Sequence, residues 1–377
     1  MKARVTQTDI ARVAGVHNTT VSLALRNSRL IPDATRKRIQ EIAEGMGYCP
    51  DPALTALVAY RNSRRSKRHA DTLAYITNWE TKWGWRDQPS QEKHYFGAQR
   101  AAAESGYHIE HFWLGEPGMT QRRLSDMLLH RGISGALVAS HHSTSDELSG
   151  IDWSRLSAVK IGCFPHSPAL NQVTVDQSSV VRLAVRHILQ SGYERLGLVI
   201  PQCVDSAVDQ AWSRAFFAEQ YLLSAKERLP ILYLQEQRPN FSPSGIRSVS
   251  SPDTRALARW YHEHRPEVIL GMGPIALSHF DHIGLHVPRD VAYVDMCLEN
   301  FPGIAGVHHN CERVGELAVE MLAAQLQQNI YGVPAMPTVT SVSGVWVEGA
   351  SLPTMTMAAV GGMQTATAGL EKTDLVA

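Results

Sequence analysis

The chain has 377 residues, which is too long for one ordinary domain core and predicts two or three domains. Apolar residues make up 44%, as in a water-soluble globular protein, and no apolar run approaches the roughly 18 residues of a membrane span. The formal net charge of zero hides an asymmetry, because residues 1–69 contain 13 Lys and Arg against 5 Asp and Glu. We therefore expect a basic head that binds a polyanion, joined to an acidic body.

The N-terminus and the cysteines both predict a cytoplasmic protein that does not associate with a membrane. No apolar run follows the basic start MKARVTQTDIARVAGV, so a secretory signal is not expected. The cysteines are odd in number, widely spaced, and form no C-x-x-C motif. Reduced thiols are therefore expected at Cys49, Cys163, Cys203, Cys297 and Cys311.

The head is predicted to contain three short helices. The first covers residues 6–14, with Thr6 as its cap, and Gly15 supplies a turn. The second runs over about 17–25, and the third starts at residue 32 and stops at Gly47. Two short helices joined through a glycine form a helix-turn-helix, the motif whose second helix enters the DNA major groove.

A hinge and a basic linker are predicted between the head and the body. Two prolines interrupt the helical pattern, residues 53–60 form a candidate hinge helix, and 61–69 are a basic run. This run is either a solubilising spacer or a phosphate contact. We expect a DNA-binding domain over 1–49 and a hinge with its linker over 50–70.

The body, residues 71–350, alternates strand and helix patterns. Such alternation predicts an α/β fold of two doubly wound parallel-sheet subdomains, with a ligand cleft at the carboxyl ends of the strands. Residues 351–377 have no clear period and are predicted to be a disordered or loosely docked tail. The two subdomains are expected to span 71–162 plus 296–328 and 163–295 plus 329–350.

Residues 6–27 and 34–57 resemble the head of the LacI/GalR family of bacterial repressors, with three helices and a hinge in the family's order and spacing. A weaker resemblance over 173–200 and 310–326 extends it to the body. The positions that match the family's head motif are Thr6, Asp9, Ile10, Ala11, Ala14, Gly15, Val16, Thr20, Val21, Ser22, Leu25, Thr35, Arg36, Ile39, Tyr48 and Pro50.

The resemblance implies a sequence-specific DNA-binding transcriptional regulator, a repressor, with a periplasmic-binding-protein-like body. Its implied partners are a double-stranded, pseudo-palindromic DNA operator, a second copy of the chain in a homodimer, and a small-molecule effector such as a sugar or sugar derivative. No cofactor and no enzymatic activity are implied. Two alternatives stay open. The core of a DNA-binding regulator could serve only for dimerisation or a protein partner, or the chain could be a solute-binding protein, against which the basic head argues.

The outer row of the second helix is predicted to meet DNA. Asn can pair with adenine, Arg and His can reach guanine or phosphate, and Leu can cover a thymine methyl. By resemblance, Asn18, Thr19 and Leu23 read the bases, and Leu57 either inserts into the minor groove or packs on the core domain. The predicted DNA contacts are Thr6, Thr8, His17, Asn18, Thr19, Thr20, Ser22, Leu23, Arg26, Arg36, Leu54 and Leu57.

Two positions in the second helix depart from the family. Leu23 stands where the family often has an Arg, so the operator half-site is expected to differ at that base. His17 stands where the family keeps a Ser that caps the helix. We hypothesise that His17 gives up capping for a phosphate or guanine contact and favours DNA binding when protonated.

The effector cleft also departs from the family pattern. Trp212 replaces the family's effector-binding Arg, and the polar motifs after two later strands are lost. One hypothesis is an altered site with Asp295 as an acceptor and with Trp212 and the tryptophans at 79, 83 and 85 as stacking faces. Alternatively, Trp212 is a core residue and the others line a loop or interface. The predicted effector-binding residues are Trp79, Trp83, Asp176, Trp212 and Asp295, with Asp176 at the cleft or at the subdomain hinge.

Other chemistries have little support in the sequence. No Walker phosphate-binding motif and no G-x-S-x-G nucleophile motif is present. Histidines cluster at 141–142, 262–264 and 308–311, but none of these clusters has the spacing of paired metal ligands, so no metal is expected.

Overall fold

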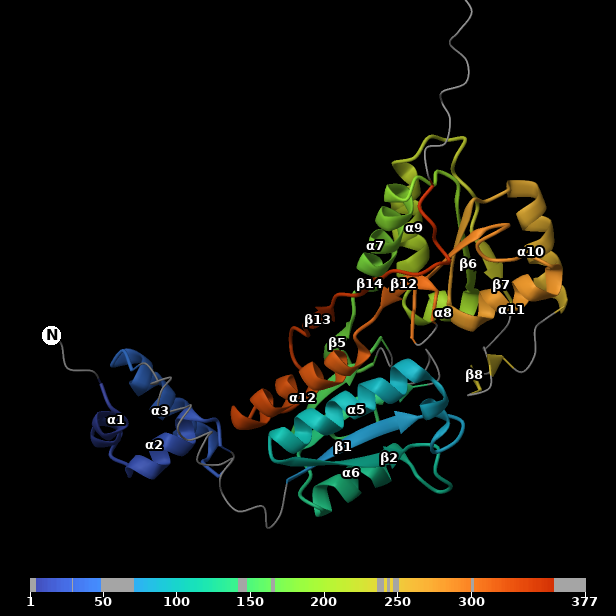
Figure 1. Ribbon diagram of the computed structural model, residues 1–377. Helices are drawn as coiled ribbons and strands as arrows, with labels where there is room; N and C mark the ends of the chain where they lie inside the picture. Colours follow the sequence, from blue (N-terminus) through green and yellow to red (C-terminus); the bar gives the residue numbers. More distant parts are fainter. Residues whose placement is uncertain are drawn as a thin grey trace, which may run out of the picture.

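The computed structural model describes most of the chain between residues 5 and 355. Figure 1 shows a small helical head and a larger body built on two main sheets. Leu54, Leu57 and residues 356–377 of the predicted tail lie outside the described residues. Ser351 and Leu352, which were predicted to belong to that tail, are buried instead, because Ser351 Oγ bonds to the backbone of Tyr293 and Ala305. The described residues are 5–28, 30–48, 71–141, 148–163, 167–235, 241–242, 245–246, 251–299 and 302–355.

Three helices form the head, as predicted: α1 (Gln7–Ala14), α2 (Asn18–Leu25) and α3 (Asp33–Gly45). Thr6 begins α1 through a capping box, in which the Asp9 amide donates to Thr6 Oγ1 and the Thr6 amide donates to Asp9 Oδ2. Gly15 ends α1 with a φ of 66°, a left-handed conformation that glycine adopts without steric strain. Val21 and Ala24 of α2 are fully buried, and they pack with Ile10 and Ile39 in the head's core.

The first sheet of the body has the strand order β13-β5-β4-β3-β1-β2, and all its pairings are parallel. Helices α5 (Pro89–Glu104) and α12 (Cys311–Gln327) cover one face, and α6 (Gln121–His130) covers the other (Figure 1). The strands are β1 (Asp71–Asn78), β2 (Tyr107–Trp113), β3 (Gly135–His141), β4 (Ser157–Ile161), β5 (Asn171–Val175) and β13 (Val339–Val342).

The second sheet has the order β14-β12-β11-β10-β6-β7, with only β14 antiparallel. Helices α7 (Gln177–Gln190) and α9 (Ala211–Tyr221) pack on one face, and α10 (Ser251–His264) and α11 (Gly273–Ile283) pack on the other (Figure 1). The strands are β6 (Leu196–Pro201), β7 (Leu232–Leu234), β10 (Val268–Gly271), β11 (Ala292–Asp295), β12 (Ala305–His308) and β14 (Val345–Val347).

Short elements complete the described fold. They are the helices η1 (Gly84–Asp87), η2 (Trp153–Arg155) and α8 (Gln202–Ala207), and the hairpin of β8 (Phe241–Ser242) with β9 (Gly245–Ile246). No helix among the described residues is both long and apolar enough to span a bilayer. The α/β class with two parallel sheets agrees with the prediction from the sequence.

The chain crosses between the two sheets after β5, between β12 and α12, and between β13 and β14. These crossovers differ from the predicted subdomain boundaries. Strand β5 pairs in the first sheet although 163–295 was assigned to the second subdomain, β12 pairs in the second sheet, and β13 pairs in the first. The physical reason is that sheet membership depends on the backbone edge with which a strand pairs, and this edge is not encoded in the local residue pattern.

The closest helix contact in the first subdomain is the crossing of α5 and α12, which two glycines permit. A Cβ atom at Gly97 would lie 1.9 Å from the Glu312 carbonyl oxygen, and one at Gly315 would lie 2.0 Å from the His94 carbonyl oxygen. Since both obstacles are backbone atoms, neither can move without shifting a helix.

We expect Gly97→Ala to lower the free energy of unfolding by about 2 kcal/mol, because the added methyl forces the two helices apart. The measurement is urea unfolding of the full chain followed by circular dichroism. Gly45→Ala is the control, since a Cβ there meets nothing within 4 Å. Equal stability of the two variants would contradict the crossing described above.

Candidate DNA interface and ligand cleft

His17 is the N-cap of α2. Its backbone is extended (φ −72°, ψ 151°), its Nδ1 accepts from the Thr19 amide at 3.3 Å, and Thr19 Oγ1 lies 2.8 Å from the same nitrogen. The hypothesis that His17 gives up capping is therefore wrong. The lone pair of Nδ1 does what a serine oxygen does at this position, and protonation of Nδ1 would remove that acceptor.

The outer face of α2 presents short polar side chains to solvent. Asn18 and Thr19 are exposed, and Ser22 and Leu23 are half-buried. Leu23 is absent from the side chains that pack on the head's core. The Arg26 guanidinium folds back along the helix, where Nε donates to the Ser22 carbonyl at 3.1 Å and Nη2 donates to Ser22 Oγ at 2.9 Å. The first turn of α2 carries no acidic residue, so nothing on it repels a phosphate.

The remaining predicted DNA contacts of the head have mixed surroundings. Thr6 is exposed but caps α1, Thr8 is exposed, and Thr20 is half-buried. Arg36 differs most from the expectation, since its side chain is only 19% exposed. Its Nη1 donates to the Ser28 carbonyl at 3.3 Å and its Nη2 pairs with Asp33 at 2.5 Å, so it holds the turn between α2 and α3.

Two polar residues that the sequence analysis missed fix how the head helices meet. Gln40 Nε2 donates to the Ala24 carbonyl at 3.0 Å, and Arg38 Nη2 donates to the Ala14 carbonyl at 3.2 Å. Each satisfies a carbonyl near the C-terminal end of another helix. Their partners lie 16 and 24 residues away, so no local signal could have revealed them.

Asp176 lies at the first crossover between the two sheets, immediately after β5. It caps α7, with Oδ1 accepting from the Ser179 amide at 2.9 Å, and its own amide donates to the Val342 carbonyl at 2.9 Å. Asn310 Nδ2 donates to the Ser343 carbonyl at 3.0 Å. All three crossovers are therefore linked by hydrogen bonds, and Asp176 takes part in that linkage.

Trp212 is a core residue, as the second interpretation of the sequence expected. It is 2% exposed, and its indole Nε1 donates to Gln177 Oε1 at 2.8 Å. Trp85 is fully buried as well. Trp83, in contrast, is 45% exposed, and its ring lies under the Arg86 guanidinium at 4.5 Å. Trp79 is half-buried, and its carbonyl accepts from Trp113 Nε1 at 2.9 Å.

Asp295 is fully buried at the end of β11. Its Oδ1 accepts from the amides of Gly273 at 3.0 Å and Cys297 at 2.8 Å, while Oδ2 has no partner among the described residues. Burial raises the pKa of this carboxyl to about 6, although the two amide hydrogen bonds oppose the shift. Through these two hydrogen bonds the Asp295 side chain connects the segments that follow β10 and β11, which is a structural role.

The junction of the two subdomains contains polar groups that the sequence analysis missed. Lys93 of α5 forms an ion pair with Glu299, which follows β11 of the second sheet. Next to it, His94 is buried with both ring nitrogens unpartnered among the described residues, and His309 Nε2 lies 2.6 Å from the Met296 carbonyl. Burial lowers the pKa of both histidines to about 4, so both are neutral near pH 7.

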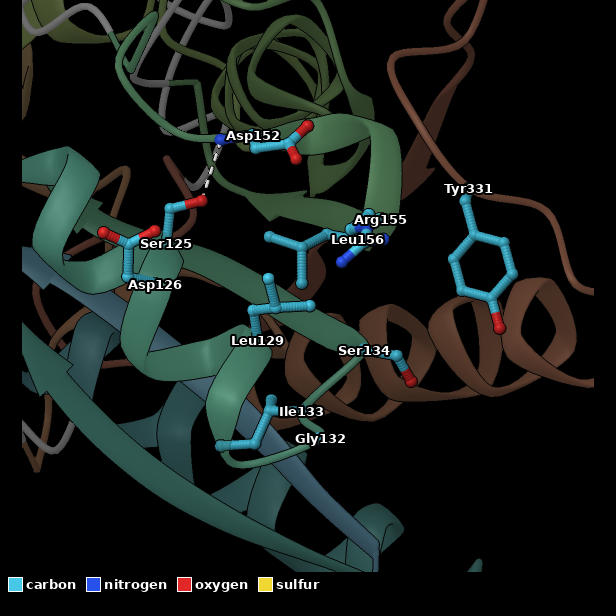
Figure 2. A pocket seen from close by; sticks show the side chains of 10 residues that line it. All are labelled: Ser125, Asp126, Leu129, Gly132, Ile133, Ser134, Asp152, Arg155, Leu156 and Tyr331. Carbon is cyan, nitrogen blue, oxygen red and sulfur yellow. Dashed lines mark hydrogen bonds between the residues drawn. The ribbon is translucent and has the colours of Figure 1, made fainter. Parts of the chain in front are cut away.

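A pocket of about 340 Å³ opens at the amino ends of the central strands β3 and β4 of the first sheet (Figure 2). Its floor is apolar, and Asp126, Asp152 and Arg155 stand around it. This position is away from the carboxyl ends of the strands, so the pocket is distinct from the predicted cleft. The residues that line it are Ser125, Asp126, Leu129, Gly132, Ile133, Ser134, Asp152, Arg155, Leu156 and Tyr331. No group of three or more possible metal ligands occurs in the described part of the chain.

A helix-turn-helix head on a body of two parallel sheets defines a DNA-binding regulator with a periplasmic-binding-protein-like core. Residues 6–51 match the family described as bacterial regulatory proteins, lacI family. This match covers the head of the chain, whose helix-turn-helix is therefore that of a LacI-family transcriptional regulator.

Curated relatives are similar over most of their length. The repressor PurR of Aliivibrio salmonicida is 22% identical over 331 residues, covering 85% of this chain and 91% of PurR. The repressor MelR of Bacillus subtilis is 26% identical over 299 residues, covering 76% of this chain and 79% of MelR.

Solved structures share the fold. The regulator CelR in complex with cellobiose is 20% identical with a TM-score of 0.55, covering 92% of this chain and all of CelR. The lac repressor dimer bound to operator and an anti-inducer is 13% identical with a TM-score of 0.53, covering 93% of this chain and all of that one.

We expect Asp295→Asn to change how stability depends on pH. A carboxyl whose pKa is higher in the folded than in the unfolded chain makes folding less favourable as pH rises from about 4 to about 6. The amide keeps an oxygen for both backbone donors and cannot ionise. The variant should therefore avoid a loss of up to about 3 kcal/mol in unfolding free energy across that range.

The measurement is urea unfolding of the full chain at several pH values between 4 and 7. Asp126→Asn, an exposed carboxyl on α6, is the matched control and should keep the wild-type pH dependence. If Asp295→Asn keeps the wild-type pH dependence as well, the buried Asp295 carboxyl does not cause the pH dependence of the free energy of unfolding.

Proposed function

We propose that the protein is a transcriptional repressor that binds a pseudo-palindromic operator in the cytoplasm as a homodimer. The observation that carries this proposal is the outer face of α2, where His17, Asn18 and Thr19 are exposed and no acidic side chain stands in the first turn. The solved lac repressor, similar in fold, is a dimer bound to operator. A twofold dimer would present two such helices to two half-sites of opposite direction.

We further propose that a small molecule, a sugar or sugar derivative, binds between the two subdomains and controls the affinity for DNA. Support comes from the three hydrogen-bonded crossovers that connect the sheets and from solved structures of similar fold, one a cellobiose complex and one with bound glucose. Asp176, Trp79 and Trp83 are the predicted effector contacts that keep exposed surface. A ligand can shift the opening of the cleft only by its different affinity for the two forms.

A second candidate is a DNA-binding regulator whose body only dimerises or binds a protein. The specific observation in its favour is that Trp212 and Asp295 are buried, with Trp212 Nε1 bonded to Gln177 and Asp295 Oδ1 bonded to two backbone amides. Both then add little to a sugar-binding surface.

The test is selection of operators from random duplexes by the full chain, followed by binding assays with and without a panel of sugars. A pseudo-palindromic consensus whose affinity changes with one sugar supports the proposal. A consensus whose affinity no sugar changes, with no heat of binding in calorimetry, favours the second candidate. No consensus at all would contradict both.

We expect Leu23→Arg to change which base the half-site prefers. Leu23 lies on the outer face of α2 and can offer only apolar contact, whereas an arginine can form two hydrogen bonds with guanine. The variant should gain about 1–3 kcal/mol of preference for guanine at one base pair of each half-site. Repeating the selection with the variant measures this, and an unchanged consensus would place Leu23 away from the bases.

We expect Lys93→Gln to loosen the contact between the subdomains, because it leaves the largely buried Glu299 carboxylate without its partner. Unfolding free energy should fall by about 1–3 kcal/mol, and the radius of gyration from solution scattering should increase. Arg131→Gln is the control, since it breaks a more exposed ion pair with Glu110 inside the first subdomain. Equal effects of the two substitutions would contradict a bridging role for Lys93.

A further inference from the structure

We propose that His17 has two functions at once: its Nδ1 caps the recognition helix, and its Nε2–H donates a hydrogen bond to an acceptor atom of the operator. This inference rests on the proposed DNA binding by α2 and assigns a contact to one atom of that surface. His17 thereby becomes a positioning residue and a DNA contact, instead of one or the other.

The contacts of Nδ1 determine which ring nitrogen carries the proton. The Thr19 amide can only donate, and it lies 3.3 Å from Nδ1, so Nδ1 must offer its lone pair. The Thr19 hydroxyl, 2.8 Å from the same atom, can add a second donor. A neutral imidazole that accepts at Nδ1 carries its hydrogen on Nε2. The cap therefore fixes the tautomer of the ring.

The second nitrogen is available for a partner. Nε2 has no hydrogen-bond partner among the described residues. His17 directly precedes α2, and its side chain is exposed to solvent. Asn18 and Thr19, which follow it, are exposed on the same end of the helix. In this helix type, residues at the N-terminal end lie against base edges and phosphates. An N–H donor fits a phosphate oxygen or the N7 or O6 acceptor of a guanine.

A shorter capping residue cannot place a donor at the same point. A serine hydroxyl can cap the helix, but its oxygen is bonded directly to Cβ, whereas Nε2 lies on the far side of the imidazole ring from Nδ1. The reach of the ring beyond the cap is therefore what distinguishes His17 from a simple cap. Ser keeps the first function and loses the second, and Ala loses both.

The experiment compares the full chain with His17→Ser and His17→Ala on the operator that the wild type selects. Helix capping is followed by hydrogen exchange of the segment 15–26, and affinity is followed by fluorescence anisotropy. We expect His17→Ser to keep wild-type exchange and bind roughly 10-fold more weakly. His17→Ala should exchange faster and bind more weakly still.

Two further arms identify the acceptor and the tautomer. Operators with single methylphosphonate or 7-deazaguanine substitutions should weaken wild-type binding at one position and leave His17→Ser unaffected there, which tells a phosphate from a guanine. Nitrogen NMR of the histidine ring should show hydrogen on Nε2. The inference is overturned if His17→Ser binds as tightly as the wild type, or if the hydrogen is on Nδ1. If the wild type selects no operator, the proposed function fails instead.

Discussion

The burial of Val21 and Ala24 between α1 and α3 is the constraint on which the head depends. These two side chains fix which face of an eight-residue helix points inward, and so they fix which face is left for DNA. An isolated helix of this length is not stable in water, so the outer face exists as a surface only because the inner face is packed. Gln40 and Arg38 then hold the ends of the neighbouring helices with hydrogen bonds.

In the body, too, packing and hydrogen bonds fix how the secondary-structure elements are placed. One contiguous hydrophobic core includes residues of both sheets, and the chain crosses between the sheets where Asp176, Asn310 and Ser343 take part in hydrogen bonds. The ion pair of Lys93 with Glu299 also joins the two subdomains, and Lys93 lines one pocket together with the crossover residue Asn310.

Local patterns in the sequence predicted the three head helices and the α/β class well, because capping residues and apolar periodicity act within one element. The strands β5, β12, β13 and β14 were missed, since they are only three to five residues long and form only by pairing with distant strands. Trp212 could not be assigned to the core or the cleft from sequence, because its surroundings come from Gln177 and from helices that meet only in the fold.

The capping role of His17 shows a limit of prediction from average residue preferences. Residue preferences describe histidine as a poor cap, and the resemblance to a family with serine there suggested a lost function. The structure shows that ring geometry can supply the same acceptor, so a preference averaged over many proteins did not decide this case. The same holds for Arg36, whose charge suggested phosphate but whose partners are Ser28 and Asp33.

The central claim is that the outer face of α2 reads DNA sequence. The most direct test is the ratio of affinities of the full chain for its selected operator and for a scrambled duplex of equal length. This ratio is measured for the wild type and for a variant with Asn18, Thr19 and Leu23 all replaced by Ala. We predict a wild-type ratio of at least roughly 1,000, which collapses towards one in the variant while binding to scrambled DNA persists. A ratio that survives in the variant would contradict the claim.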